Sequence, residues 1–411
     1  MRITNRKNIL IVSQYFWPES FLINNFETRL TKYANIIVLT GLPNYPDGEI
    51  KKKYKNIKNL YYEKWKNIQI IRFPIIPRKK GGAIFLSINY LSFLINGLKY
   101  SKRISFDQKI DHILFYSTSP ITSCIPAIAL KSRLKAKLSI WVQDLWPESL
   151  QATGYINNKI IIKLFGILVR YIYKKSDYIF AQSKSFVKNI QKYSHKKINI
   201  LYNSHLSKKS KKKIILDNKI LDILKKKKCF AFAGNLGKAQ SLETIVNCAK
   251  KISMLDKSIH FLIIGDGSEK KNIKKVIFKN NITNISLHGP YDASVVDEIL
   301  KKTISNLITL KKHSIFSLTI PNKFQSYLLS GKPIICAIDG ELKEIINTNK
   351  LGEAASAEDY SSLSEIVIRY SKLSKSELNK FKKKNIQFYN KNFEIDKQVK
   401  LFLKTVKCIK K

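Results

Sequence analysis

Acidic residues are scarce in this sequence of 411 residues: Asp and Glu number 29 against 75 Lys and Arg, and the net charge is +46. So basic a composition is typical of proteins that bind nucleic acid or an anionic membrane. Lys, Ile and Asn recur in every segment, however, which indicates a coding bias as well. No basic motif interleaved with aromatic residues is present, so we expect no nucleic-acid partner and keep two explanations, a bias and a surface that faces anionic lipid.

Cysteines are also few. The five of them, Cys124, Cys229, Cys248, Cys336 and Cys408, are scattered and form no Cys-x-x-Cys pair. This excludes a disulfide framework and a zinc site, and it fits a reducing cytoplasm. Asp-x-Asp, His-Glu-x-x-His, Gly-x-Gly-x-x-Gly and Gly-x-x-x-x-Gly-Lys-Ser/Thr are all absent. We therefore expect no protein metal site and neither a Rossmann dehydrogenase nor a P-loop enzyme.

Long apolar runs are lacking too. The best candidate, Ala83–Leu98, carries no charge, but it contains two serines and two asparagines and is shorter than the roughly 20 residues that a membrane span needs. A second run, Ile160–Tyr173, is interrupted by Lys163 and Arg170. Each is either a core-facing helix or a helix that docks on a membrane. The apolar run at residues 8–13 is too short for a signal peptide.

Short apolar runs alternate with helical patterns along the whole chain, which predicts parallel βαβ units and an α/β fold. Between them a helix is expected near Asn24–Tyr33 and another at Leu242–Ser253. The expected strands are Ile9–Ser13, Ile36–Thr40, Asp111–Tyr116, Leu138–Val142, Tyr178–Ala181, Ile198–Tyr202, Phe230–Ala233, Ile259–Ile264, Ile285–His288, Asn306–Leu310 and Pro333–Ile338.

A lysine-rich stretch separates two apolar halves and predicts a domain boundary near residue 206. We expect an N-terminal domain over residues 1–206, a basic linker over 207–228, a C-terminal domain over 229–387 and an amphipathic tail over 388–411. Ligands of parallel sheets bind at the carboxyl ends of the strands, so the loops that follow the strands are the candidates for chemistry.

The loop after the first strand of the second half runs from a strand through Gly234, Asn235 and Gly237 to Lys238 and then into a helix. Glycines let backbone amides approach a ligand, and a helix N-terminus with a lysine favours an anion. The loop therefore predicts a cradle for a diphosphate. The alternative is a tight turn with a solvated lysine.

Two further loops of the second half are candidates. In Gly265-Asp266-Gly267 the carboxylate either binds a ligand hydroxyl or caps the next helix. The stretch from Pro321 to Gly331 predicts a short helix with Pro at its first position and Gly after its end. Lys323 in the first turn opposes the helix dipole, which indicates a nearby negative group or an incidental surface lysine.

In the first half, Asp144 follows a buried strand between Trp141 and Trp146, which makes it a candidate catalytic carboxylate at a strand end. The alternative is that it caps the helix expected near Pro147. Glu148 begins that helix.

Five stretches in this order resemble the family 4 retaining glycosyltransferases of the GT-B fold, in which two Rossmann-like domains face each other across a cleft. The sequence is most similar to the WbuB-like subgroup of bacterial surface-polysaccharide biosynthesis. The stretches are Gln14 to Glu19, Thr40 to Gly48, Trp141 to Ser149, Gly234 to Ser241 and Pro321 to Pro333.

The resemblance implies a nucleotide-sugar donor, UDP-linked, in the C-terminal domain and no other cofactor. Lys238 would hold the diphosphate and Asp144 would lie near the reacting sugar. The family's Glu-x(7)-Glu pair is replaced here by Leu318 and Ser326, and its usual arginine by Asn235. The donor residues implied are Gly234, Asn235, Gly237, Gly265, Asp266, Gly267, Asn322, Lys323, Gln325 and Ser326, and the acceptor-side residues are Glu19, Asn44, Tyr45 and Glu148.

Together these features predict a metal-independent retaining transfer of an N-acetylated hexose or deoxyhexose to a lipid-linked saccharide in O-antigen or capsule assembly. The protein is expected in the cytoplasm, peripheral on the inner face of the membrane. A nucleotide-sugar epimerase of the same fold and a basic nucleic-acid-binding protein are the alternatives.

Overall fold

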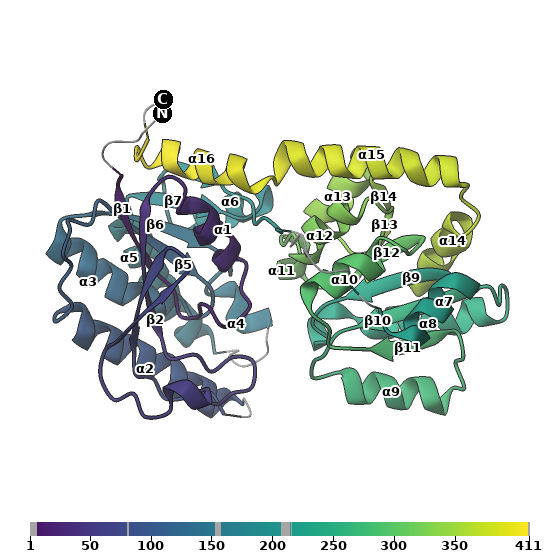
Figure 1. Cartoon of the computed structure of the whole chain (residues 1–411), viewed down its shortest axis with the longest axis horizontal. Helices are drawn as coiled ribbons and strands as arrows, with labels where there is room; N and C mark the ends of the chain where they lie inside the picture. Colours follow the sequence, from purple (N-terminus) through teal and green to yellow (C-terminus); the bar gives the residue numbers. More distant parts are fainter. Residues whose placement is uncertain (1–5, 80–81, 153–157, 207–213, 215, 410–411) are drawn as a thin grey trace. The chain divides into compact units, whose positions relative to one another are not determined.

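The computed structural model describes residues 6–79, 82–152, 158–206, 214 and 216–409, and the chain divides into two compact units. Unit 1 comprises residues 1–204 and 395–411, and unit 2 comprises residues 205–394. Each contains one largely parallel sheet covered by helices (Figure 1). This is the two-domain α/β architecture that the alternating pattern predicts.

Unit 1 has an eight-stranded sheet in the order β3-β4-β2-β1-β5-β6-β7-β8, in which only the edge pair β3–β4 is antiparallel. The strands are β1 (Asn8–Val12), β2 (Asn35–Gly41), β3 (Tyr61–Trp65), β4 (Ile68–Phe73), β5 (His112–Ser117), β6 (Lys137–Val142), β7 (Tyr178–Ala181) and β8 (Ile198–Ile200). The helices are α1 (Ile23–Leu30), α2 (Ala83–Ser101), α3 (Ile125–Leu134), α4 (Glu148–Ala152), α5 (Lys159–Lys175), α6 (Lys184–Gln191) and α16 (Ile395–Thr405), with 3-10 turns η1 (Lys52–Tyr54) and η2 (Ile121–Cys124).

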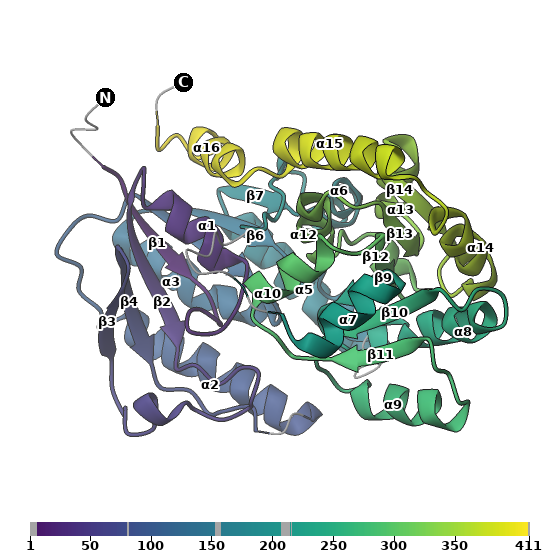
Figure 2. The same ribbon diagram turned by 45° about the vertical axis from the view of Figure 1, so that its right-hand side comes forward.

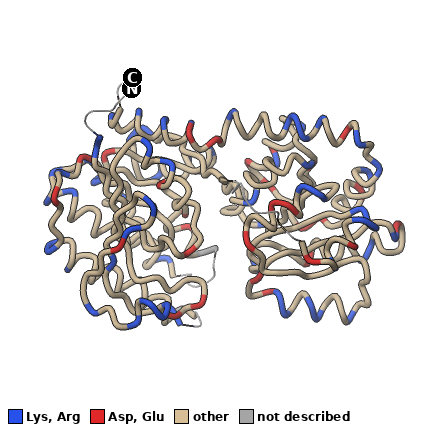
Figure 3. The backbone as a smooth tube through the Cα atoms, viewed as in Figure 1, with Lys and Arg blue, Asp and Glu red and all other residues tan. Residues whose placement is uncertain are grey.

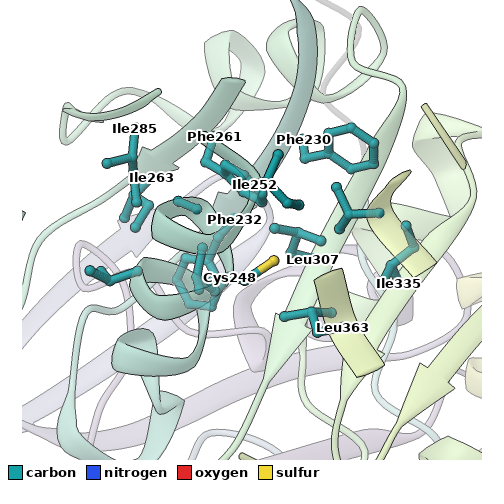
Figure 4. Close-up of a cluster of buried hydrophobic side chains, with 14 of the residues drawn as sticks. Phe230, Phe232, Cys248, Ile252, Phe261, Ile263, Ile285, Leu307, Ile335 and Leu363 are labelled. Atoms are coloured by element: carbon teal, nitrogen blue, oxygen red, sulfur yellow. The ribbon is translucent and has the colours of Figure 1, made fainter. Parts of the chain in front are cut away.

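Unit 2 has a six-stranded parallel sheet in the order β11-β10-β9-β12-β13-β14. Its strands are β9 (Lys228–Ala233), β10 (Ile259–Ile264), β11 (Ile285–His288), β12 (Ser305–Thr309), β13 (Ile334–Ala337) and β14 (Gly352–Ala355). Its helices are α7 (Asn218–Lys226), α8 (Leu242–Ser253), α9 (Lys270–Lys279), α10 (Ala293–Leu300), α11 (Ser314–Ser317), α12 (Lys323–Ser330), α13 (Glu341–Thr348), α14 (Tyr360–Tyr370) and α15 (Lys375–Asn392), with a 3-10 turn η3 (Lys238–Gln240). Aromatic and aliphatic side chains of β9, β10 and α8, among them Phe230, Phe232, Phe261 and Ile252, fill its core (Figure 4).

The linker and the C-terminal tail differ in the structure from the segments that the sequence predicts. The segment expected as a linker, 207–228, contains helix α7, whose Ile220 is buried, while residues 207–213 and 215 lie outside the described part of the chain. The expected tail does not begin at residue 388, because α15 continues through it to Asn392. Of the two C-terminal helices, α15 belongs to unit 2, whereas α16 belongs to unit 1 and lies against α1 (Figures 1 and 2).

Two strands at the edge of unit 1 were not expected. β3 carries Glu63 and Lys64 and alternates between half-buried and exposed positions, so its apolar signal is weak. β4 is more apolar, but it reaches its place beside β2 only through the β3–β4 hairpin. No helix in the described part of the chain has the length and apolar character needed to cross a membrane.

A single carboxylate connects the loops that follow β1 and β2. Glu19 is buried, and its Oε1 accepts hydrogen bonds from the backbone N–H groups of Asn44 (2.8 Å) and Tyr45 (2.7 Å). Its Oε2 accepts from the N–H of Phe16 at 3.2 Å. The first two bonds hold the loop of residues 40–48 against the loop after β1, and the third fixes the loop after β1 itself. Burial raises the pKa of Glu19 to about 7, although the three amides oppose the shift.

The C-terminal helix gives the first prediction. Phe402 of α16 is fully buried and contacts the rings of Phe26, His112 and Phe180. Phe402→Ala should lower the free energy of unfolding of unit 1 by about 3–5 kcal/mol. All four tryptophans of the chain lie in unit 1, so tryptophan fluorescence during urea denaturation reports on this unit alone.

Leu401, on the exposed side of the same helix, provides the matched control, and Leu401→Ala should change the free energy by no more than about 0.5 kcal/mol. Equal effects of the two substitutions would contradict the placement of α16 in the core of unit 1.

Glu19 gives the second prediction. The folded chain keeps the Glu19 proton up to about pH 7, whereas the unfolded chain releases it near pH 4.5. The contribution of this group to stability is therefore complete below pH 4.5 and is lost as the pH rises through about 7, in total roughly 3 kcal/mol. Glu19→Gln keeps a carbonyl acceptor for Asn44 and Tyr45 but does not titrate. Urea denaturation between pH 4.5 and about pH 7 should show that the free energy of unfolding changes less with pH in the variant than in the parent protein. The same pH dependence in both proteins would refute the raised pKa of Glu19.

Candidate functional site

The candidate site in unit 2 is formed by loops at the carboxyl ends of β9 and β10. The N–H of Gly234 donates to the carbonyl of Ile264 (2.9 Å), and the N–H of Leu236 donates to the carbonyl of Asp266 (2.8 Å). A Cβ at Gly265 would lie 1.9 Å from the Gly234 carbonyl oxygen, and Gly265 has φ +144°. Only glycine fits such a position, so the close packing of these two loops requires glycine at position 265.

Lys323 supplies the charge at these loops. Its Nζ lies 2.6 Å from Oε1 of Gln240 and 3.5 Å from the centre of the Phe232 ring, and a Cβ at Gly234 would lie 3.6 Å from it. No Asp or Glu pairs with Lys323 among the residues described, and burial holds the pKa of its amine well below the ordinary value. The Lys323 amine therefore lies beside the exposed backbone of Gly234 with no acidic side chain next to it, and an anion bound there would favour its charged form.

Lys238 precedes α8, which begins at Leu242 as the sequence predicts. It lies in the 3-10 turn η3 between Gly237 and that helix, and it is exposed. The backbone of this turn is fixed from β12, because the N–H of Lys311 donates to the carbonyl of Ala239 and the hydroxyl of Thr309 donates to that of Gln240. Lys238 thus lies on the outer side of the loop, while Lys323 occupies its inner side.

Asp266 does not cap the next helix. That helix, α9, begins at Lys270, and no side chain caps it. The carboxylate of Asp266 is exposed, accepts from the N–H of Gly267 at 2.9 Å and lies 3.6 Å from the Lys270 amine. The capping alternative is therefore wrong, and the carboxylate is accessible to a ligand hydroxyl.

Helix α12 carries the remaining predicted donor residues. It runs from Lys323 to Ser330 with Asn322 as N-cap, so Pro321 precedes the cap and the prediction that it takes the first helical position is wrong. Gly331 follows the last helical residue with a φ of +71°, which confirms the expected glycine terminator. The hydroxyl of Ser326 donates to the Lys323 carbonyl, so Ser326 faces its own helix. Gln325 is buried, and its Oε1 has no hydrogen-bond partner within the described residues.

Tyr327 is a residue that the sequence reasoning missed. Its hydroxyl accepts from the Ala233 N–H (2.7 Å) and donates to the Ala233 carbonyl (3.2 Å), which fixes the last residue of β9 directly before Gly234. It follows Lys323 by one helical turn, so α12 presents both side chains to the same loop. That spacing is the signal in the sequence from which Tyr327 could have been found.

Three further predicted donor residues lie in the same two loops. Asn235 lies against Gly237, with its Nδ2 2.9 Å from the Cβ position of Gly237. A Cβ at Gly267 would lie 2.6 Å from the Leu236 backbone.

In unit 1 the candidate residues lie at the carboxyl ends of β2, β1, β5 and β6, which are adjacent parallel strands. Asp144 follows β6, and its Oδ2 accepts from both the N–H and the hydroxyl of Ser119, each at 2.8 Å. The same hydroxyl accepts from Nε1 of Trp146 at 3.0 Å. Burial raises the pKa of Asp144, and the Ser119 bonds oppose that rise. The bonds connect the loop after β5 to the loop after β6. Within the described part of the chain Asp144 makes no hydrogen bond to the N-terminal amides of α4, so the structure does not support the capping alternative.

The acceptor-side residues fall into two groups. Glu19, Asn44 and Tyr45 are brought together by the hydrogen bonds of Glu19 to the other two backbones, so the Glu19 carboxylate positions the loop. Glu148 begins α4 as expected, and its Oε1 lies 3.1 Å from the Tyr193 hydroxyl. No group of three or more His, Cys, Asp and Glu within the described ranges is arranged to hold a metal ion.

Comparisons with known proteins agree with this geometry. Residues 214–388, which include most of unit 2, match the family described as glycosyl transferases group 1. The probable glycosyltransferase WbjE of Pseudomonas aeruginosa is 20% identical over 70% of this chain and 73% of its own length. The putative colanic acid biosynthesis glycosyl transferase WcaI of Escherichia coli K12 is 19% identical over 80% of this chain and 83% of its own.

Solved structures are similar over nearly the whole chain. The trehalose-6-phosphate protein of E. coli bound with UDP-2-fluoro glucose has a TM-score of 0.73 at 11% identity, covering 98% of this chain and 100% of that one. HepE of Anabaena in complex with UDP and glucose has a TM-score of 0.67 at 12% identity, covering 98% and 99%. The chain therefore has the GT-B fold, and within it residues 214–388 match the model of the glycosyl transferases group 1 family.

Proposed function

We propose that this protein is a retaining glycosyltransferase that moves a sugar from a UDP-linked donor to a lipid-linked saccharide in bacterial surface-polysaccharide assembly, either O-antigen or capsule. The sugar is an N-acetylated hexose or deoxyhexose, and the reaction takes place on the cytoplasmic side of the membrane. Support comes from the match to the group 1 family and from a relative named for colanic acid biosynthesis. The observation that carries the proposal is the Lys323 amine beside Gly234 without an acidic partner.

The chemistry of the proposal rests on charge. When the bond between the sugar and the nucleoside diphosphate breaks, negative charge develops on the leaving phosphate oxygens. An ammonium group held in a poorly solvated place stabilises such a charge more than one in water does. Lys323 and the backbone N–H groups of the loop that begins at Gly234 supply this stabilisation, so we propose that the reaction needs no metal ion. Lys238, on the outer side of the loop, assists.

Asp144 has the second role in the proposal. Its Oδ2 is used by Ser119, which leaves Oδ1 to accept a hydrogen bond from a sugar hydroxyl. The surrounding side chains of Leu145 and Trp146 are buried, so such a bond would be little weakened by water. Asp144 would orient the reacting groups without forming a covalent bond to the sugar.

The direct test is a thermal-shift screen with a panel of nucleoside-diphosphate sugars, followed by transfer assays with the ligand that raises the melting temperature most. We expect a UDP-sugar to stabilise the protein and its sugar to appear on a lipid-linked acceptor. Release of an altered nucleotide sugar in the absence of any acceptor would contradict the proposal and indicate an epimerase.

Lys323→Met removes the charge but keeps a long side chain over Phe232. We expect kcat/KM to fall at least about 10²-fold, equivalent to about 2.7 kcal/mol of lost transition-state stabilisation. Lys238→Ala should cost about tenfold. Lys279→Met, at the exposed C-terminal end of α9, is the matched control and should leave transfer unchanged. Near-normal turnover of the Lys323→Met enzyme would exclude the proposed phosphate site.

Asp144→Asn keeps the shape of the side chain and can still accept the Ser119 hydrogen bonds through its carbonyl oxygen. If the negative charge orients the reacting hydroxyls, kcat should fall by roughly 10² or more while nucleotide affinity and melting temperature stay nearly constant. Ser119→Ala leaves the Asp144 carboxylate and the Ser119 N–H donor in place, so kcat should fall less in this variant than in Asp144→Asn. An Asp144→Asn enzyme with full activity would show that Asp144 only connects two loops.

A further inference from the structure

Helix α2 has the reverse of the polarity of an ordinary surface helix. Two of its polar side chains point inward: Asn89 donates to the Ile76 carbonyl and accepts from Gln14, and Asn96 donates to the Pro74 carbonyl. Its large apolar side chains point outward, and Ile84, Leu91 and Ile95 are more than half exposed. An amphipathic helix in a soluble fold normally buries its apolar face. The exposed face of α2 therefore has no partner within the described part of unit 1.

Helix α5 has a similar row of exposed apolar side chains. Its exposed apolar residues are Ile160, Leu164, Ile167 and Tyr171, and those of α2 are Ile84, Ile88, Leu91 and Ile95. The spacing is the same in both helices, four, three and four residues, which places each set in one stripe along its helix.

The two helices lie on one face of unit 1. The connections β4–α2–β5, β5–α3–β6 and β6–α5–β7 all run in the same direction along the sheet, and right-handed crossovers place such helices on the same side. Helix α3 contacts both α2 and α5. The opposite side carries α1, which connects β1 to β2 in the other direction, and α16, which packs on α1.

Charge identifies the partner. The sequences of α2, α3 and α5 contain no Asp or Glu, whereas they contain Lys99, Lys131, Arg133, Lys159, Lys163, Arg170, Lys174 and Lys175. Exposed apolar stripes flanked only by basic residues match the boundary between acyl chains and anionic headgroups. A second copy of the chain would bring the same positive charges against one another, so charge disfavours a homodimer through this face.

From these observations we infer that the stripes of α2 and α5 form a docking surface for an anionic lipid bilayer, into which unit 1 inserts side chains without spanning it. The surface lies outside the donor site of unit 2, and lipid binding requires neither nucleotide nor acceptor. The inference deepens the proposed function, since it places the enzyme on the membrane that would hold a lipid-linked acceptor, but it is tested without that function.

The test uses the full chain in sedimentation with vesicles of phosphatidylcholine alone or of phosphatidylcholine mixed with phosphatidylglycerol. We expect preferential binding to the anionic vesicles that weakens as salt rises. The double variant Leu91→Glu with Leu164→Glu, both on exposed positions, should lower the partition coefficient by about tenfold or more, because it places a charge in each stripe. The matched control is Met254→Glu with Phe278→Glu, which alters two even more exposed apolar side chains in unit 2 and should bind like the parent.

Tryptophan fluorescence and transfer to a water-soluble acceptor analogue show whether the stripe variant is folded. If it is folded and binds vesicles as the parent does, the inference is wrong. Equal binding of the parent to neutral and anionic vesicles at low salt also overturns it. A dimer on size-exclusion chromatography that the stripe variant abolishes, without vesicle binding by the parent, would assign the face to a second copy instead. Vesicle binding without any sugar transfer would support the docking surface and refute only the proposed function.

Discussion

The desolvated amine of Lys323 is the constraint on which the arrangement of unit 2 depends. A buried ammonium group without a carboxylate partner destabilises a fold, and the protein limits this cost with one amide oxygen and one aromatic face, Gln240 Oε1 and the Phe232 ring. Neither partner carries a negative charge, so an anion bound beside the amine would be the group that favours its charged form. Gly234 places no side chain beside the amine, and Gly265 lets the neighbouring loop pack against the Gly234 backbone. Loop sequence, helix position and electrostatics are thus consequences of holding one charge next to bare backbone.

The same reasoning explains the role of Tyr327. A phosphate-binding loop is useful only if its amides stay in place when the ligand is absent, because a loop that must become ordered on binding loses affinity to entropy. The Tyr327 hydroxyl uses both its donor and its acceptor capacity on Ala233, and Thr309 and Lys311 hold the other end of the loop at residues 239 and 240. The loop is therefore preorganised by β12 and α12, which are distant from it in sequence.

How much of this could be read from the sequence depends on the range of the interaction. The alternation of apolar runs and helical patterns predicts both parallel sheets, and glycine spacing predicts where the backbone turns. The choice between Lys238 and Lys323 could not be made, because Lys238 is the nearer in sequence to Gly234 and only the packing of α12 brings the other amine under the loop. Glu19 presents a similar case. It lies in the stretch Gln14 to Glu19, which resembles the family and therefore suggests a functional residue. Its role as a hydrogen-bond acceptor for Asn44 and Tyr45, however, depends on the pairing of β1 with β2. The edge hairpin β3–β4 was missed because its strand β3 has little apolar signal to read.

The net charge of the chain says less about a binding surface than the distribution of acidic and basic residues over each side of a unit. Lys and Arg are spread along nearly every segment of both units (Figure 3), so a charge of +46 by itself distinguishes no face. What sets one side of unit 1 apart is the absence of acidic residues from three neighbouring helices, together with the inward turn of the asparagines of α2. A coding bias toward lysine adds positive charge everywhere, but it gives no reason for isoleucine and leucine to point into solvent in matched stripes on two helices. The two explanations of the basic composition are therefore compatible, since a biased sequence supplies the charge and the apolar stripes decide where a membrane would use it.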